Sequence, residues 1–269
     1  MKKKIIIYFC IAFFAFTQEY KTPPDIARIH ERGKIVVAVL GVDQPPFFYK
    51  SKERVLKGFD IWLAQEIAKS LGVRLVFDRS AKAFNDLVTI IANRKADIVI
   101  SKLSRTLARA QIVKFTNPYI TLRQALLINR LRLAERTSES DIDRFIRDFR
   151  GRLGVVANSS YEAYAQRNFP NAEIVTYDNW NRVVKAVMKG DVLAAYRDEL
   201  EIKKIIKSNP QISLRLKTVL LTDTEDNIAM AVNAQDVQLL YWLNLKLESL
   251  KIDYTADSLL NKYEDVFRK

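Results

Sequence analysis

The residues best suited to bind an anion lie between positions 101 and 109, in the segment SKLSRTLAR. This segment leads into a short helix that we expect over residues 106–113, and Ser104 and Thr106 can both cap it. A helix N-terminus presents free N–H groups and the positive end of the helix dipole, and both favour negative charge. Arg109 can grip a carboxylate there through two parallel hydrogen bonds. Spacing alone also allows a surface arginine on an ordinary amphipathic helix.

The composition excludes several other kinds of site. The net charge is +13, but the basic residues are scattered, without the basic stripe and interleaved aromatics that nucleic-acid binding requires, so we predict no nucleic-acid partner. The chain has one cysteine, Cys10, and one histidine, His30. A histidine metal cluster and a Ser-His-Asp triad are therefore not available, and we predict no metal and no cofactor.

The first seventeen residues are typical of a secretory signal peptide. The basic start MKKK precedes the apolar run Ile5–Phe16 and then polar residues. This run is shorter than the ~20 apolar residues that a membrane span needs. An uncleaved anchor is the alternative, and Cys10, preceded by Tyr8 and Phe9, does not have the small neighbours of a lipidated cysteine. We therefore expect export to the periplasm or another extracytoplasmic compartment.

The rest of the chain contains the same β-α-β-α-β pattern twice, which predicts two open α/β lobes. The expected strands are 35–39, 73–77 and 96–100, then 153–156, 173–176 and 192–196. Extended runs near 120–128 and 218–230 are expected to be hinge strands, and two C-terminal helices, 236–250 and 256–267, to return to the first lobe. We predict lobe 1 from residues 18–121 and 226–269, and lobe 2 from residues 122–225. Such sheets place ligands beyond the carboxyl ends of their strands.

Four short motifs occur in an order that resembles the family 3 extracellular solute-binding proteins, the amino-acid receptors of ABC importers. The motifs are Gly58-Phe-Asp60, Lys95-Ala-Asp97, Thr106-x-x-Arg109 and Phe115-x-x-Pro-Tyr119. The resemblance runs from about Ile29 to the C-terminus. It implies a two-lobe periplasmic-binding-protein-like fold joined by two hinge strands. It also implies a monomer that captures an amino acid between closing lobes and delivers it to the membrane subunits of an ABC permease.

The resemblance also implies roles for particular residues. Arg109 matches the arginine that pairs with the ligand's α-carboxylate, and Ser104 the hydroxyl residue that helps to hold it. Asp198 matches the aspartate that accepts the α-ammonium group, although a helix cap is the alternative for this residue. Ser159 and Ser160 match the strand-to-helix turn of the second lobe. Arg109 and Asp198 would then hold a zwitterion from opposite lobes.

Two aromatic residues match the family's pocket walls, and one residue departs from the family at a turn. Phe84 is expected to line the pocket. Phe47 is a candidate for the same role in the proline-aromatic loop, although core packing is the favoured alternative for it. Asn158 stands where the family usually has glycine, and asparagine tolerates left-handed backbone better than most residues.

Lys102 and Arg197 affect the expected ligand. Lys102 replaces a small residue of the family, and Arg197 precedes Asp198. If either side chain points inward, charge pairing favours an acidic amino acid. Both could instead lie in solvent, and the carboxylates Asp43, Asp60 and Glu199 could prepare the site for a cation. We expect a polar or charged amino acid.

Two other functions are compatible with the sequence. Some relatives on this scaffold dehydrate arogenate or prephenate, which needs a general acid over the substrate ring. Asp198, Glu199 and Lys102 are the candidates for that role. The third possibility is a ligand-sensing domain that acts on a separate signalling partner.

Overall fold

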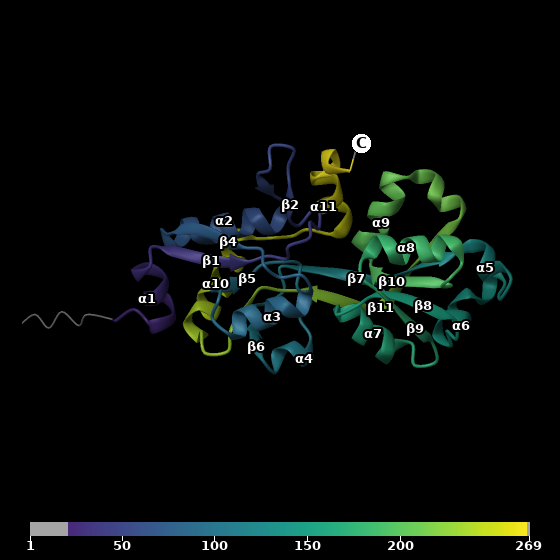
Figure 1. Ribbon diagram of the computed structural model, residues 1–269, viewed down its shortest axis with the longest axis horizontal. Helices are drawn as coiled ribbons and strands as arrows, with labels where there is room; N and C mark the ends of the chain where they lie inside the picture. Colours follow the sequence, from purple (N-terminus) through teal and green to yellow (C-terminus); the bar gives the residue numbers. More distant parts are fainter. Residues whose placement is uncertain (1–20, 268–269) are drawn as a thin grey trace, which may run out of the picture.

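The computed structural model describes residues 21–267 and contains two five-stranded sheets flanked by helices (Figure 1). The predicted fold class is therefore confirmed. The predicted signal peptide, residues 1–17 with Cys10, lies outside the described residues. Among the residues described, no helix combines the length and the apolar character needed to cross a membrane.

The first sheet combines the early strands with one strand from late in the chain. Its order is β4 (Arg74–Asp78), β1 (Lys34–Ala38), β5 (Ile98–Val99), β12 (Ala231–Asn233) and β6 (Val113–Phe115). Strand β1 is parallel to β4 and β5, whereas β12 is antiparallel to β5 and β6. We call this sheet and its helices lobe 1. A small hairpin of β2 (Tyr49–Lys50) and β3 (Leu56–Lys57) is attached to it.

The helices of lobe 1 are α1 (Pro24–Glu31), α2 (Phe59–Leu71), α3 (Phe84–Ala92), α4 (Leu107–Ala110), α10 (Val237–Leu250) and α11 (Ala256–Lys262), followed by the 3₁₀ turn η3 (Glu264–Val266). Among them, α1 was not expected, the expected helices 106–113 and 256–267 are shorter, and the others lie where the sequence predicted them. Helix α4 is one turn long, because the chain after it continues as β6 and pairs with β12. Helix α2 begins after Gly58, whose φ is 126° and where a Cβ would lie 2.3 Å from the Phe47 carbonyl oxygen. Only glycine fits this approach.

The second sheet, with its helices, forms lobe 2. Its order is β11 (Leu216–Ile228), β7 (Ile120–Asn129), β10 (Ala194–Asp198), β8 (Arg152–Val156) and β9 (Glu173–Tyr177). The helices are α5 (Arg130–Ala134), α6 (Ile142–Arg147), α7 (Ser160–Asn168), α8 (Trp180–Lys189) and α9 (Glu199–Ser208), with 3₁₀ turns η1 (Glu139–Asp141) and η2 (Pro210–Leu214). Strands β8, β9 and β10 are parallel, as the repeated strand-helix pattern with its apolar third strand predicted.

Strands β7 and β11 run through the middle of the molecule between the two lobes (Figure 1). They pair antiparallel from Ile120 opposite Ile228 to Asn129 opposite Leu216, with a register shift between Leu220 and Glu225. The expected hinge segments thus form one two-stranded ribbon. The predicted boundaries at 121/122 and 225/226 fall within this ribbon and stay a prediction.

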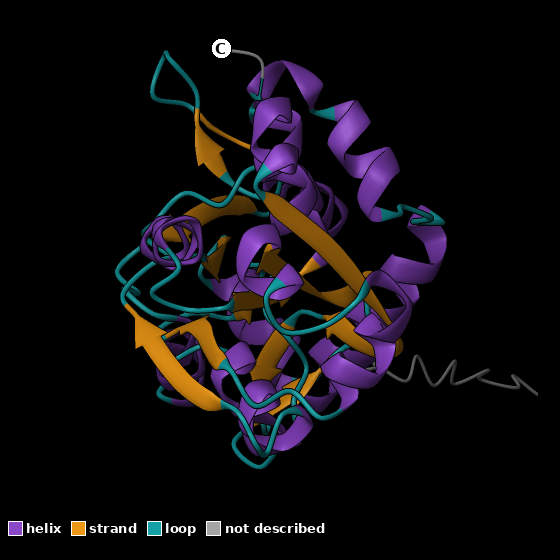
Figure 2. Cartoon of the chain, turned by 90° about the vertical axis from the view of Figure 1, so that its right-hand side faces the viewer, coloured by secondary structure: helices purple, strands orange, loops and turns teal. Residues whose placement is uncertain are grey.

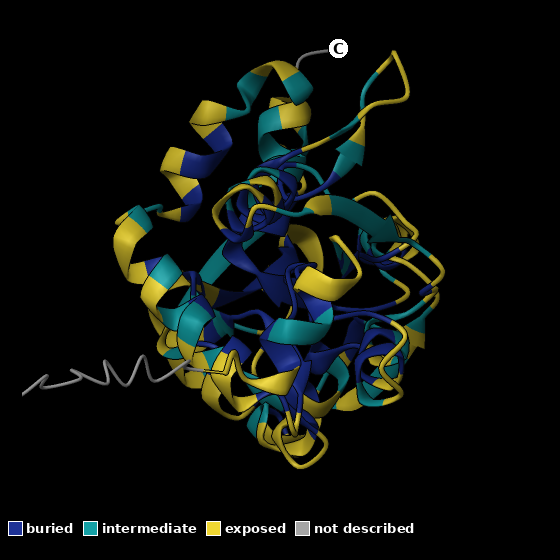
Figure 3. Cartoon of the chain, turned by 90° about the vertical axis from the view of Figure 1, so that its left-hand side faces the viewer, coloured by how far each residue is buried: buried dark blue, intermediate teal, exposed yellow. Residues whose placement is uncertain are grey.

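Each lobe has its own apolar core. Helices surround the strands in the end-on view of Figure 2, and buried residues fill the interior in Figure 3. The lobe 1 core is one large cluster that includes Phe47 and Phe59. In lobe 2 separate clusters form around Tyr196 and around Val183. Leu200 of α9 joins the lobe 1 cluster, and apart from this contact movement about the β7–β11 ribbon need not disrupt either core.

Candidate functional site

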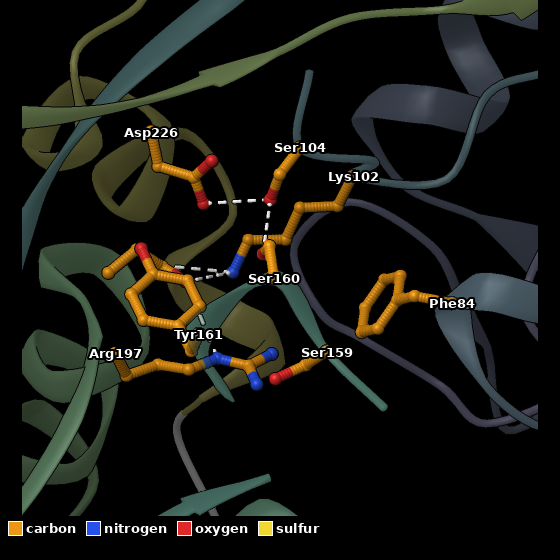
Figure 4. A pocket seen from close by; sticks show the side chains of 9 residues that line it. Phe84, Lys102, Ser104, Ser159, Ser160, Tyr161, Arg197 and Asp226 are labelled. Carbon is orange, nitrogen blue, oxygen red and sulfur yellow. Dashed lines mark hydrogen bonds and ion pairs between the residues drawn. The ribbon is translucent and has the colours of Figure 1, made fainter. Parts of the chain in front are cut away.

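A pocket lies where the two lobes face each other (Figure 4). Its lining residues are Phe84, Lys102, Ser104, Ser159, Ser160, Tyr161, Arg197, Asp198 and Asp226. Most of them follow the carboxyl ends of β5, β8 and β10, the position expected for ligands of open α/β sheets. The free space at its centre is about 10 Å³, about what one water molecule requires.

Asp60 joins two of the sequence motifs, its own and that of Tyr119, to the segment 101–109. Its carboxylate accepts a 2.7 Å hydrogen bond from the Lys102 backbone N–H and a 2.9 Å bond from the Tyr119 hydroxyl. Burial raises the pKa of Asp60 to about 7, although both hydrogen bonds oppose that shift. Asp60 is not among the lining residues. It fixes the turn at Lys102 and does not point toward a ligand.

Lys102 bridges the lobes with a buried side chain. Its Nζ lies 3.0 and 2.9 Å from the two carboxylate oxygens of Asp198 and 2.9 Å from Glu201 Oε1. Its backbone is left-handed, with φ of 46°. The expectation that this lysine could lie in solvent was wrong, because the turn held by Asp60 directs its side chain across the interface.

Asp198 has two structural partners at once. One of its carboxylate oxygens accepts a 3.0 Å hydrogen bond from the Glu201 backbone N–H, so it caps α9 while it also pairs with Lys102. The sequence analysis missed Glu201, although its position three residues after a cap is typical of a capping box. Burial alone would raise the pKa of Glu201, but Lys102 and Lys204 hold it below its ordinary value. Lys204 bonds the second Glu201 oxygen at 2.8 Å.

Arg197 is also buried, so its solvent alternative was wrong as well. Its Nε lies 3.5 Å from Asp198 Oδ2 and has no hydrogen-bond partner within residues 21–267. The guanidinium carbon lies 5.6 Å from the ring centroid of Tyr161 and 5.8 Å from that of Trp180. These rings provide cation–π contacts. The buried hydroxyl of Tyr161 makes no hydrogen bond of normal geometry in this part of the chain, although it lies close enough to Asp226 to oppose the rise in the pKa of that carboxyl.

Hydroxyl groups from the two lobes meet at Asp226. Ser104 Oγ lies 2.8 Å from Ser160 Oγ and donates a 3.0 Å hydrogen bond to Asp226 Oδ2, so Ser160 must donate to Ser104. The Tyr164 hydroxyl contacts Asp226 Oδ1 at 3.4 Å. Burial, and then the charge of Asp198, raises the pKa of Asp226 to about 6. The sequence analysis missed Asp226, because neighbouring residues of β11 are polar and exposed and give no signal of burial.

The turn before α7 has the geometry that the sequence predicted. Asn158 has a φ of 55°, in the left-handed region. Ser159 donates a 2.6 Å hydrogen bond from Oγ to the Val156 carbonyl, and Ser160 begins the helix. Both serines are buried and line the pocket.

Arg109 and Phe47 lie beside this pocket and are not among its lining residues. Arg109 donates a 2.9 Å hydrogen bond to the Ser104 carbonyl and a 3.1 Å bond to Asn85 Oδ1. It lines an adjoining pocket that shares Ser159 and Ser160 with the first. The structure places Phe47 in the lobe 1 core, fully buried, as the core-packing alternative predicted. The Phe47 ring does contact a pocket residue, because Lys102 Nζ lies 5.2 Å from the centroid of that ring.

Known proteins share this fold and sequence pattern. Residues 35–266 match the sequence profile of the bacterial extracellular solute-binding proteins, family 3. The chain belongs to this family.

Three of the proteins it resembles show the range of the similarity. ABC transporter arginine-binding protein 1 of Escherichia coli is 26% identical over 223 residues, which are 81% of this chain and 86% of that protein. A putative binding component of an ABC transporter from Wolinella succinogenes, complexed with lysine, has a TM-score of 0.71 and 28% identity, covering 86% of this chain and 96% of that one. An ancestral amino-acid-binding protein, a precursor of cyclohexadienyl dehydratase, has a TM-score of 0.70 and 26% identity, covering 88% and 98%.

Proposed function

We propose that this family member captures an amino acid between its lobes, outside the cytoplasm, and delivers it to an ABC importer. The observation that carries the proposal is the interlobe pocket, which presents fixed cations, fixed carboxylates and hydroxyl groups on buried side chains. A zwitterion needs both signs of charge in fixed positions. Because the two lobes supply different groups, the binding free energy is gained only when the lobes come together.

The geometry suggests how an amino acid would be held. Ser160 can donate to a ligand carboxylate once its bond to Ser104 opens, and Phe84 forms the wall of the pocket. Arg109 would reach the same carboxylate by leaving the Ser104 carbonyl, which lies in the same turn. Each charge-assisted hydrogen bond contributes roughly 1.5–3 kcal/mol.

Entry requires the lobes to separate, because the space at the centre of the pocket is far smaller than an amino acid. The contact between Ser104 and Ser160 would open, and so would the bridge from Lys102 to Asp198. An ion pair outside the pocket would open with them, between Lys203 of α9 and Asp257 of α11, at 2.9 Å. We propose that the β7–β11 ribbon accommodates this movement.

Family membership supports a permease as partner, a monomeric receptor and an extracytoplasmic location. We favour binding over catalysis, because the three candidate general acids are occupied by one another or by neighbours. Lys102 pairs with Asp198, and Glu199 pairs with Lys203 at 2.9 Å and accepts the Arg123 backbone N–H. Turnover of arogenate or prephenate by the purified protein would contradict this part of the proposal.

A thermal-shift screen of the purified protein against the common amino acids tests the proposal. A ligand at one hundred times its dissociation constant stabilises the fold by about 2.7 kcal/mol, which raises the midpoint by several degrees. A shift with one or a few amino acids is expected. No shift with any of them would contradict an amino-acid ligand.

Arg109→Ala and Arg105→Ala form a matched pair for the carboxylate role. Both residues lie in the segment 101–109, but Arg109 is buried beside the pocket and Arg105 is exposed. We expect Arg109→Ala to weaken the best amino acid at least a hundredfold and Arg105→Ala to change it less than threefold. Similar affinities for both variants would refute the role of Arg109.

A further inference from the structure

The ammonium group of Lys102 occupies the place beside Asp198 and Glu201 where the cation of a ligand could bind. An ammonium group has three donors, and Lys102 Nζ has three oxygens within 3.0 Å, two from Asp198 and one from Glu201. The second oxygen of Glu201 is held by Lys204. Both carboxylates are therefore already charge-paired within the protein, which weakens their attraction for a ligand's ammonium group.

The backbone at Lys102 shows that the lysine is held there against a local preference. A φ of 46° is disfavoured for lysine and free of strain for glycine. Such a conformation persists where the surroundings fix it, and here the Asp60 carboxylate binds the Lys102 N–H at 2.7 Å. The turn would therefore accept glycine, and glycine would leave Asp198 and Glu201 open to the pocket.

The groups still available in the pocket are mainly donors. Arg197 is 4% exposed, and no hydrogen bond to it is found within residues 21–267. The Tyr161 hydroxyl is buried and also makes no hydrogen bond of normal geometry in that part of the chain. The nearest acceptor of Arg197, Asp198 Oδ2 at 3.5 Å, is already bound to Lys102, so this guanidinium is complementary to a carboxylate brought by a ligand. The carboxylate oxygen with the weakest partner is Asp226 Oδ1, at 3.4 Å from Tyr164, and it remains for an α-ammonium group.

Building on the proposed function, we infer that Lys102 determines specificity, and that the pocket selects an acidic amino acid over a cationic one. The ε-ammonium of Lys102 takes the place of a ligand cation on Asp198 and Glu201. Arg197 receives the carboxylate of the ligand's side chain. A lysine or arginine ligand would bring a second cation to carboxylates that are already paired, and would leave Arg197 without an acceptor.

Calorimetric titration of glutamate, aspartate, lysine and arginine into the full chain tests this inference. The wild-type protein should bind the better acidic amino acid at least tenfold more tightly than the better cationic one. Lys102→Gly should shift this affinity ratio at least tenfold toward the cationic ligand. Lys251→Gly is the matched control, because Lys251 also has a left-handed backbone, φ 48°, but lies exposed at the end of α10. It relieves similar backbone strain and should leave the ratio unchanged.

A second variant keeps the test valid if Lys102→Gly does not fold. Lys102→Gly leaves two buried carboxylates without their shared cation, whereas Lys102→Gly combined with Glu201→Gln removes one charge of each sign. This double variant should show the same shift of the ratio. A wild-type preference for lysine or arginine, or a shift below tenfold in both variants, overturns the inference while the amino-acid receptor stands. If the wild-type protein binds no amino acid, the proposed function and this inference both fail.

Discussion

Asp226→Asn should stabilise the protein near pH 7 and leave its stability unchanged near pH 4. The pKa of the Asp226 carboxyl is raised from 3.8 to about 6 by burial and by the charge of Asp198. Between these two values the folded state binds more protons than the unfolded state, so stability falls as pH rises through this window and stays lower above it. At 1.36 kcal/mol per pH unit, the ionised carboxylate costs up to roughly 3 kcal/mol at pH 7. Asparagine keeps an acceptor for the Ser104 hydroxyl without this cost.

Denaturant unfolding at pH 7 and pH 4 measures the effect. At pH 7 the variant should also melt roughly 5–10 °C above the wild type. Asp223→Asn is the control: Asp223 lies on the same strand but is exposed, so its effect should stay within about 0.5 kcal/mol at both pH values. If Asp226→Asn does not stabilise the protein at pH 7, or stabilises it equally at both pH values, then ionised Asp226 does not destabilise the folded state.

Two further substitutions test the packing around the site. Gly58→Ala should unfold the protein or lower its free energy of unfolding by several kcal/mol, because the new Cβ would lie 2.3 Å from the Phe47 carbonyl oxygen. Gly72→Ala is the control: Gly72 also has a positive φ, but its Cβ would meet nothing within 4 Å. This variant should lose only about 1 kcal/mol of stability. Comparable thermal melts for the two variants would contradict the close approach at Gly58. Tyr161→Phe should stabilise the protein by about 1–3 kcal/mol, since it removes a buried hydroxyl without a hydrogen bond of normal geometry. It should also weaken the best ligand; a loss of stability would show that the hydroxyl is satisfied.

The fold could be predicted from the sequence because its signals are repeated and local. Two runs of alternating strands and helices, each with an apolar third strand, predict the parallel part of each sheet, with covered faces. The expected helix over 106–113 was too long, because the pairing of β6 with β12 joins residues more than a hundred positions apart. No local pattern contains that information.

Some features of the candidate site could likewise be predicted from local sequence, and others could not. The positions of Ser159 and Ser160 after β8 and of Asp198 at the end of β10, and the left-handed turn at Asn158, follow from residue types at strand ends. The direction of a long side chain does not, and the inward orientation of Lys102 depends on a carboxylate 42 residues earlier in the chain.

The partners that the sequence analysis missed are contributed from outside the motifs. Asp226 lines the pocket from β11, and Glu201 of α9 contacts it through Lys102, so both become functional candidates only when the two lobes face each other. For Arg109 the motif was recognised, but the direction of its side chain was not predicted. It occupies a motif position, yet its guanidinium bonds the Ser104 carbonyl beside the pocket.

The most direct test of the account is a crystal structure grown with the amino acid that most raises the melting temperature. The account predicts that the ligand lies between the lobes and contacts Phe84 from lobe 1 and Arg197 from lobe 2, with Lys102 still paired to Asp198. A ligand bound elsewhere, for example in the surface groove beside Lys203 and Asp257, would contradict it.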